Sequence, residues 1–211
     1  MDYSRRNYST YGSRPTARVR RRRISALLVV LALLVAGGVA LAPLVNRAIE
    51  HFELPLQYAP IIRQQAAAQH VDPALIAAVI YAETRFRPRT SPTGAEGLMQ
   101  LEPATALFLA HHTHGYSFRV SDLGTPQVNI TYGTYYLRYL LNLYGGSKLL
   151  ALAAYNGGET NVDNWLTAAR AQHRQLTVNA IPIPQTRAYV AEVLSKQQDY
   201  RSQYARQLGY G

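Results

Sequence analysis

The hydrophobic positions of this chain follow two different patterns. Residues 24–45 form an uncharged, mostly apolar run of 22 residues, ISALLVVLALLVAGGVALAPLV. As a helix, such a run spans roughly the 30 Å of a bilayer core. From residue 56 onward, apolar residues recur at steps of three and four, the spacing of an amphipathic helix. The sequence therefore predicts one N-terminal transmembrane helix followed by an all-α domain with at most a small β-hairpin.

The domain should contain several helices of ordinary length. Turn residues and apolar spacing place them at 56–70, 73–86, 103–110, 126–144, 147–155, 160–170 and 185–207. Residues 111–125 are expected to form a loop, and the hairpin is expected around residues 91–100. Gly94 and Gly97 bracket a turn there, where glycine tolerates positive φ and lets the backbone approach a ligand closely.

The charge of the chain is concentrated at its N-terminus. The formal net charge is +10, but residues 1–23 hold eight arginines and Asp2, so +7 lies there and only +3 in the remainder. A basic tail beside an apolar run is typical of a membrane protein rather than a nucleic-acid binder. Because the tail also has hardly any aliphatic side chains, we expect residues 1–23 to be a disordered cytoplasmic tail.

The positive-inside rule then orients the chain. Arg20 to Arg23 adjoin the apolar run, which predicts an anchor at residues 24–45 in the bacterial inner membrane and a domain, residues 46–211, on the extracytoplasmic or periplasmic side. A cleaved signal peptide is the alternative, because Ala40 and Ala42 form an AxA pattern. Pro43 directly after that cut and a run longer than a signal-peptide core favour the uncleaved anchor. The absence of cysteine excludes disulfides and a lipoprotein anchor.

The most informative candidate for chemistry is Glu83. Asp72 is a good helix N-cap, and Glu83 follows Ile80 by three residues on the apolar face of the predicted helix. A carboxyl that packs with apolar residues loses hydration, so its pKa should rise and it could donate a proton near neutral pH. The alternative is an ordinary ion pair with Arg85, Arg87 or Arg89, which would lower that pKa.

Five separated segments resemble one known family. ETRF at residue 83, SPTGAEGLMQLEPAT at 91, NITYGTYYL at 129, ALAAYNGGETNVDNWL at 151 and IPIPQTRAYVAEVL at 181 are similar, in that order, to the soluble-type lytic transglycosylases, relatives of goose-type lysozyme. The resemblance covers roughly residues 56–200 and implies a lysozyme-like fold that cuts peptidoglycan without a cofactor. It makes Glu83 the sole catalytic acid and base. It also implies a saccharide groove lined by Gln100, Tyr155 and Asn156. Leu98 and Met99, which follow the glycine turn, are expected to give this groove an apolar wall, and Ser91 is a further expected contact.

Three positions depart from the family pattern. Thr84 replaces the usual serine after the catalytic glutamate and keeps a hydroxyl group. Glu102 stands where the family commonly has methionine, and Gln185 stands where it commonly has glutamate. Because the last two positions are expected to contact substrate, these departures bear on subsite preference rather than on the acid itself.

A single catalytic acid leaves three functional alternatives open. In the family mechanism the substrate's own 2-acetamido group supplies the second function, and 1,6-anhydro-muramyl ends result. A hydrolytic muramidase would need a second carboxylate, for which Glu102 and Glu96 are the candidates. A non-catalytic wall-binding scaffold is the third alternative, and an envelope-spanning machine is a candidate partner for any of them.

The remaining patterns have simpler interpretations. The tyrosines at 132, 135, 136 and 139 recur at helical spacing and predict a mostly buried stripe, with about one facing sugar. Trp165 is expected in the core. Gly157 and Gly158 are expected to end a helix and present Tyr155 and Asn156 at its tip. We expect no metal site, because the loop histidines at 111, 112 and 114 lack acidic or cysteine partners at ligand spacing.

Overall fold

The computed structural model describes residues 33–42, 54–113 and 117–210, and the chain divides into two compact units, Met1–Glu53 and Leu54–Gly211. In the first unit, residues 33–42 form a helix whose side chains are all exposed. Within the described residues, no helix is both long enough and apolar enough to cross a bilayer. Most of the predicted anchor, residues 24–32 and 43–45, and the whole predicted tail lie outside the described residues.

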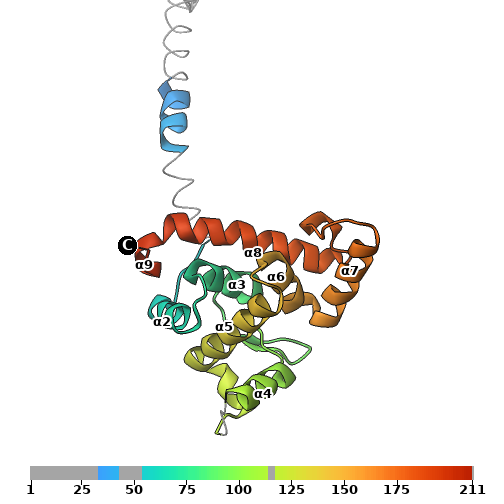
Figure 1. Cartoon of the computed structure of the whole chain (residues 1–211). Coiled ribbons are helices and arrows are strands. Elements are labelled where there is room, and N and C mark those ends of the chain that lie inside the picture. Colours follow the sequence, from blue (N-terminus) through green and yellow to red (C-terminus); the bar gives the residue numbers. More distant parts are fainter. Residues whose placement is uncertain (1–32, 43–53, 114–116, 211) are drawn as a thin grey trace, which may run out of the picture. The chain divides into compact units, whose positions relative to one another are not determined.

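The second unit is mostly helical, as the sequence predicts (Figure 1). Its α-helices are α2 (Ala59–Gln69), α3 (Pro73–Thr84), α4 (Pro103–His112), α5 (Pro126–Leu143), α6 (Lys148–Gly157), α7 (Glu159–Ala171), α8 (Pro184–Gln203) and α9 (Ala205–Leu208). Two 3₁₀ turns, η1 (Val120–Gly124) and η2 (Val178–Ala180), and two short strands, β1 (Arg89–Thr90) and β2 (Glu96–Gly97), complete it. The strands pair in antiparallel register, Arg89 with Gly97, which is the predicted hairpin.

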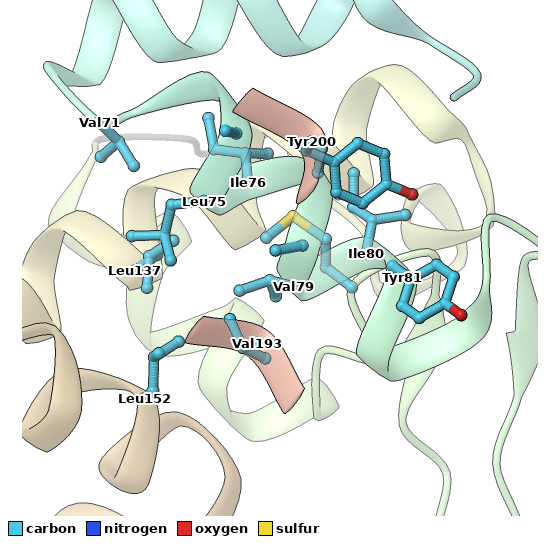
Figure 2. Close-up of a cluster of buried hydrophobic side chains, with 14 of the residues drawn as sticks. Val71, Leu75, Ile76, Val79, Ile80, Tyr81, Leu137, Leu152, Val193 and Tyr200 are labelled. Atoms are coloured by element: carbon cyan, nitrogen blue, oxygen red, sulfur yellow. The ribbon is translucent and has the colours of Figure 1, made fainter. Parts of the chain in front are cut away.

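Helix α3 lies at the centre of the core and is more deeply buried than its sequence pattern indicates. Every residue from Ala74 to Tyr81 is buried, rather than one apolar stripe. The long helix α8 packs along α3, and α2 packs on it as well. Figure 2 shows Leu137 of α5, Leu152 of α6 and Val193 of α8 in the same apolar cluster. A helix without a polar face is typical of burial on all sides.

Both ends of α3 are fixed by specific contacts. As predicted, Asp72 is the N-cap and accepts a 2.9 Å hydrogen bond from the Ala74 N–H. Its carboxylate also accepts bonds from Gln197 and Arg201 of α8 and from the Tyr210 hydroxyl. Burial alone would raise the pKa of Asp72, but these hydrogen bonds lower it overall. The N-terminus of α3 is thereby tied to α8 and to the C-terminal segment.

The other end of α3 differs from the prediction. The helix stops at Thr84 because Arg85 and Phe86 adopt left-handed conformations, with φ of 51° and 63°. This turn directs the Phe86 ring into the core, where its centroid lies 6.0 Å from that of Tyr200. The packing gained by the ring offsets the cost of two non-glycine residues in this region.

Other boundaries differ where contacts favour a change. Helix α4 extends to His112 into the predicted loop, and Thr113 caps it with a 2.9 Å bond to the Leu109 carbonyl. The rest of that loop contains η1, and the N–H of its N-cap residue Arg119 donates to the Asp122 carboxylate at 2.9 Å. The last predicted helix divides into α8 and α9 at Tyr204, whose side chain is buried.

The hairpin and the turn after it are held by one buried side chain, Asn129. Its Oδ1 accepts a 2.8 Å bond from the Met99 N–H. Its Nδ2 lies 2.9 Å from the Glu96 carbonyl and 3.1 Å from the Leu123 carbonyl. Gly97 makes this approach possible, since a Cβ there would lie 2.2 Å from Asn129 Nδ2. The turn that carries residues 97–101 is therefore fixed to the start of α5.

Candidate active site

Glu83 lies in the last turn of α3 and faces an open cleft of about 530 Å³. The opposite walls come from the hairpin, from the start of α4, from α5, from the end of α6 and from the start of α8. Besides the residues predicted from the sequence, the cleft is lined by Thr93, Ala95, Leu101, Thr105, Tyr136, Ala154, Gly157 and Gly158. Segments far apart in the chain thus meet around one carboxyl group.

The structure brings most of the predicted site residues into this cleft. Glu83 and six of the seven expected substrate contacts line it, the six being Ser91, Gln100, Glu102, Tyr155, Asn156 and Gln185. Met99 does not. Its side chain and that of Leu98, expected as an apolar wall of the groove, are fully buried in the core. Met99 packs against Gly133, where a Cβ would meet its sulfur at 2.4 Å.

The environment of Glu83 favours its protonated form. Burial raises the pKa of its carboxyl to about 7, although the neighbouring Tyr189 hydroxyl and the Arg89 guanidinium act in the opposite direction. Such a group can hold a proton near neutral pH and transfer it to a bound molecule within hydrogen-bond distance.

The described residues show no ion pair at the Glu83 carboxylate, which was the alternative to a raised pKa. No cation among them lies within 4.0 Å of the Glu83 carboxylate. Arg89 donates to the backbone carbonyl of Glu83 at 3.1 Å, and Arg85 pairs with Glu192 on α8 at 3.4 Å. Arg85 and Arg89 thus bond to groups other than the Glu83 carboxylate, and burial is the dominant influence on this carboxyl.

Tyr189 is a neighbour of Glu83 that the sequence reasoning missed. Its side chain is 7% exposed, and its hydroxyl makes no hydrogen bond of good geometry among the described residues. It nevertheless lies close enough to Glu83 to lower the pKa of that carboxyl, and Glu83 in turn raises the pKa of Tyr189. The segment TRAYV was part of the family resemblance, so a tyrosine there was the available signal.

Two of the predicted groove residues also build the cleft wall. The Gln100 amide donates to the carbonyls of Arg89 at 2.7 Å and of Gly97 at 2.8 Å, and its own φ is 47°. The Tyr155 hydroxyl donates to the Met99 carbonyl at 2.9 Å. Thr84, the departure beside Glu83, places its hydroxyl 2.8 Å from the Leu98 carbonyl. These bonds fix the turn at 97–101 against α3 and α6.

The candidates for a second carboxylate are placed differently. Glu102 is exposed and lines the cleft. Glu96 lies on β2, where its carboxylate accepts a 2.9 Å bond from Thr90, and it is not part of the cleft lining. Of the two, only Glu102 could face a bound saccharide.

The aromatic residues depart in part from the predicted buried stripe. Each tyrosine of the α5 stripe is half-buried, and Tyr136 is the one that lines the cleft. Trp165 is half-buried and packs against the main core cluster. Among the described residues, no three histidine, cysteine, aspartate or glutamate side chains gather as a metal site would require, and His114 lies outside those residues.

Comparison with known proteins places this arrangement in a family. Residues 60–178, more than half of the 211-residue chain, match the transglycosylase SLT domain. The soluble lytic murein transglycosylase of Escherichia coli K12 is 32% identical over 158 residues, which cover 72% of this chain and 24% of that protein. A membrane-bound lytic murein transglycosylase C of Yersinia enterocolitica is 30% identical, covering 69% of this chain and 47% of that protein.

The fold gives the same result. The structure of an inactive mutant of the lytic transglycosylase Slt from Pseudomonas aeruginosa matches with a TM-score of 0.65 and 29% identity, over 72% of this chain and 25% of that one. The chain therefore belongs to the transglycosylase SLT domain family, and its domain is lysozyme-like. It spans about a quarter of the length of these soluble relatives.

Removing the Tyr189 hydroxyl should change the pH dependence of any activity that needs protonated Glu83. Activity should fall as the pH rises through about 7, where Glu83 loses its proton. Because the Tyr189 hydroxyl favours the ionised carboxylate, Tyr189→Phe should move this descending limb to higher pH, by roughly half to one pH unit. The measurement is the rate of peptidoglycan solubilisation between pH 5 and 9.

The matched control for this change is Tyr200→Phe. It removes a hydroxyl from the same helix, α8, but one that donates to the Pro55 carbonyl at 2.6 Å. In this control, the fall of activity at high pH should occur at the same pH as in wild-type protein. An unchanged limb in Tyr189→Phe would show that the hydroxyl does not influence the carboxyl.

Proposed function

We propose that this chain is a peptidoglycan lytic transglycosylase that cleaves the β-1,4 bond between N-acetylmuramic acid and N-acetylglucosamine. The observation that carries the proposal is the half-buried carboxyl of Glu83, with a pKa raised to about 7, at the wall of an open cleft. Membership of the SLT domain family supports the same reaction class, since the relatives named above are lytic murein transglycosylases.

The proposed mechanism needs only that one acid. Protonated Glu83 donates its proton to the glycosidic oxygen, while the 2-acetamido oxygen of the muramic acid residue attacks its own anomeric carbon. The C1–O bond to the departing sugar breaks with its electron pair. Glu83, now a carboxylate, accepts the proton of the 6-hydroxyl, whose oxygen attacks C1 and displaces the acetamido oxygen. The product is a 1,6-anhydro ring, and no water is consumed.

The environment of Glu83 suits both halves of this cycle. A pKa near 7 lets the carboxyl hold its proton before the first step and act as a base in the second. The Tyr189 hydroxyl stabilises the carboxylate formed between the steps. Gln100, Tyr155 and Asn156 would hold the saccharide, while Glu102 and Gln185 would set preferences at the subsites they face.

Analysis of the released products tests this proposal. The full-length chain in non-ionic detergent should release muropeptides with anhydro-muramyl ends from purified peptidoglycan, each about 18 mass units lighter than the hydrolytic product, since hydrolysis alone adds a water. A digest in ¹⁸O-labelled water should leave these ends unlabelled. Labelled reducing ends would instead establish the muramidase alternative, with Glu102 as its candidate second carboxylate, and no release at all would favour a binding scaffold.

We also propose that residues 24–45 anchor the enzyme to the inner membrane, with the domain on the extracytoplasmic side. The uncharged 22-residue run, its flanking arginines and the exposed apolar side chains of residues 33–42 support this. One relative is named as membrane-bound. Extraction of cell membranes tests the anchor, since a cleaved or soluble chain would leave the membrane fraction in high salt.

A further inference from the structure

Aromatic rings continue outward from the cleft in an unbroken series of contacts. Tyr155 and Tyr136 line the cleft with their ring centroids 5.2 Å apart. Tyr139, one turn further along α5, stacks on Tyr136 at 6.2 Å with an interplanar angle of 13°. Phe108 of α4 lies 5.6 Å from Tyr139, and His112 lies 4.0 Å from Phe108. The series therefore passes from the cleft to residues that are not part of its lining.

The outer rings lie on the same helix faces that line the cleft. On α4, Thr105 lines the cleft, and Phe108 and His112 follow at steps of three and four residues. On α5, Tyr139 follows Tyr136 by three residues. Residues at such steps lie on one face of a helix. Two helices thus carry their cleft-facing surfaces past the cleft and place aromatic rings where those surfaces meet.

These outer rings are accessible and stand among polar groups. Phe108 is 40% exposed, and His112 is exposed. The Tyr139 hydroxyl lies 3.4 Å from the Glu159 carboxylate, at the start of α7 beside the cleft glycines. A pyranose ring has an apolar C–H face that stacks on an aromatic ring and hydroxyls that bond to groups at its edge. Two exposed rings, next to the half-buried Tyr139 ring and its carboxylate neighbour, match both features.

We propose that Tyr139, Phe108 and His112, here called the aromatic track, bind sugar residues of a glycan strand whose scissile bond lies at Glu83. This inference rests on the proposed function. The occupant is a polysaccharide because the aromatic track continues the lining of the saccharide cleft without a break. A long strand would gain contacts that a short one cannot reach, so the track should set the preference for strand length.

Cleavage of strands of different length tests the track. The full-length chain in detergent is given glycan strands freed of stem peptides, either short or long, and kcat/KM is measured for each. Phe108→Ala should lower the ratio of long-strand to short-strand kcat/KM by about fivefold, the effect of losing one aromatic contact, through a higher KM for the long strands. Tyr139→Ala should act in the same direction, and Phe108→Trp should restore the ratio.

The matched control is Leu107→Ala, which removes an exposed apolar side chain next to Phe108 on another face of α4. Leu107 is 52% exposed. The Leu107→Ala variant should keep the wild-type ratio of long-strand to short-strand kcat/KM. If wild-type protein cleaves both strands and the two aromatic-to-alanine variants keep its ratio, the aromatic track is overturned. An equal fall in Leu107→Ala would overturn it too, because the effect would then be general. No cleavage by wild-type protein would instead overturn the proposed function.

Discussion

Glu83→Gln is expected to abolish glycan cleavage, with a fall in rate of at least about a thousandfold. Glutamine keeps the size of the side chain but has no proton to donate to the glycosidic oxygen and no basic oxygen for the second step. The other acid in the cleft lining, Glu102, is exposed and is not expected to replace it. Release of muropeptides from purified peptidoglycan measures the change, and co-sedimentation with peptidoglycan shows whether binding remains.

The same substitution should stabilise the fold at high pH. The Glu83 carboxyl titrates at about 7 in the folded domain, above its ordinary value of 4.5. Below pH 4.5 both states hold the proton. As the pH rises, the unfolded chain ionises first, so wild-type protein loses stability up to about pH 7. Glu83→Gln avoids this loss and should be more stable by roughly 3 kcal/mol at pH 8 and nearly equal at pH 4.

The control for both effects is Glu96→Gln. Glu96 lies on the hairpin outside the cleft lining, so this variant should keep wild-type activity and the wild-type dependence of stability on pH. Urea unfolding at pH 4 and pH 8 provides the stability measurement. Residual cleavage above one per cent in Glu83→Gln, with anhydro ends, would mean that another residue supplies the proton.

Of the substitutions proposed here, Asn129→Leu is expected to lower the free energy of unfolding the most, by about 3–5 kcal/mol. Asn129 is fully buried and bonds the Met99 N–H and the carbonyls of Glu96 and Leu123. Leucine has a similar volume but leaves the Met99 N–H and the Leu123 carbonyl without this partner in the interior, while the Glu96 carbonyl keeps only its 3.0 Å bond from the Leu101 N–H. Since small domains are stable by only about 5–15 kcal/mol, such a loss should be plain in urea unfolding.

A second asparagine on the same helix provides the comparison. Asn142→Leu makes the same change on α5 at an exposed position and should alter stability by less than about 0.5 kcal/mol. Activity should fall in Asn129→Leu even at low temperature, because the turn carrying Gln100 is no longer held. If the two variants unfold at the same urea concentration, the Asn129 contacts do not hold the turn as the geometry indicates.

Local sequence signals predicted the helices well. Asp72 and Pro73 marked the start of α3, and the glycines at 157 and 158 marked the end of α6, because caps and breakers act through the backbone nearby. Boundaries were missed where distant contacts decided them. Phe86 was expected to continue its helix, but the core beside Tyr200 takes its ring and ends the helix two residues earlier.

The candidate site was predicted in composition but not in arrangement. The family resemblance singled out residues that do line the cleft, such as Gln100 and Asn156. The position of Met99 after the glycine turn also predicted that it lines the groove, whereas its side chain fills the space left by Gly133. Which of two neighbours in a turn faces a cleft depends on the backbone conformation of that turn, and sequence periodicity carries no information about it.

The sequence by itself determined that the domain is helical and that Glu83 stands at the end of an apolar helix, since both follow from residues close together in the chain. Only the tertiary structure decided that α8 buries this helix on a second side, that Tyr189 comes to lie beside Glu83, and that Arg85 and Arg89 bond elsewhere. The proton on Glu83 depends on this second group of facts, because desolvation of a carboxyl is set by everything packed around it, from whichever part of the chain it comes.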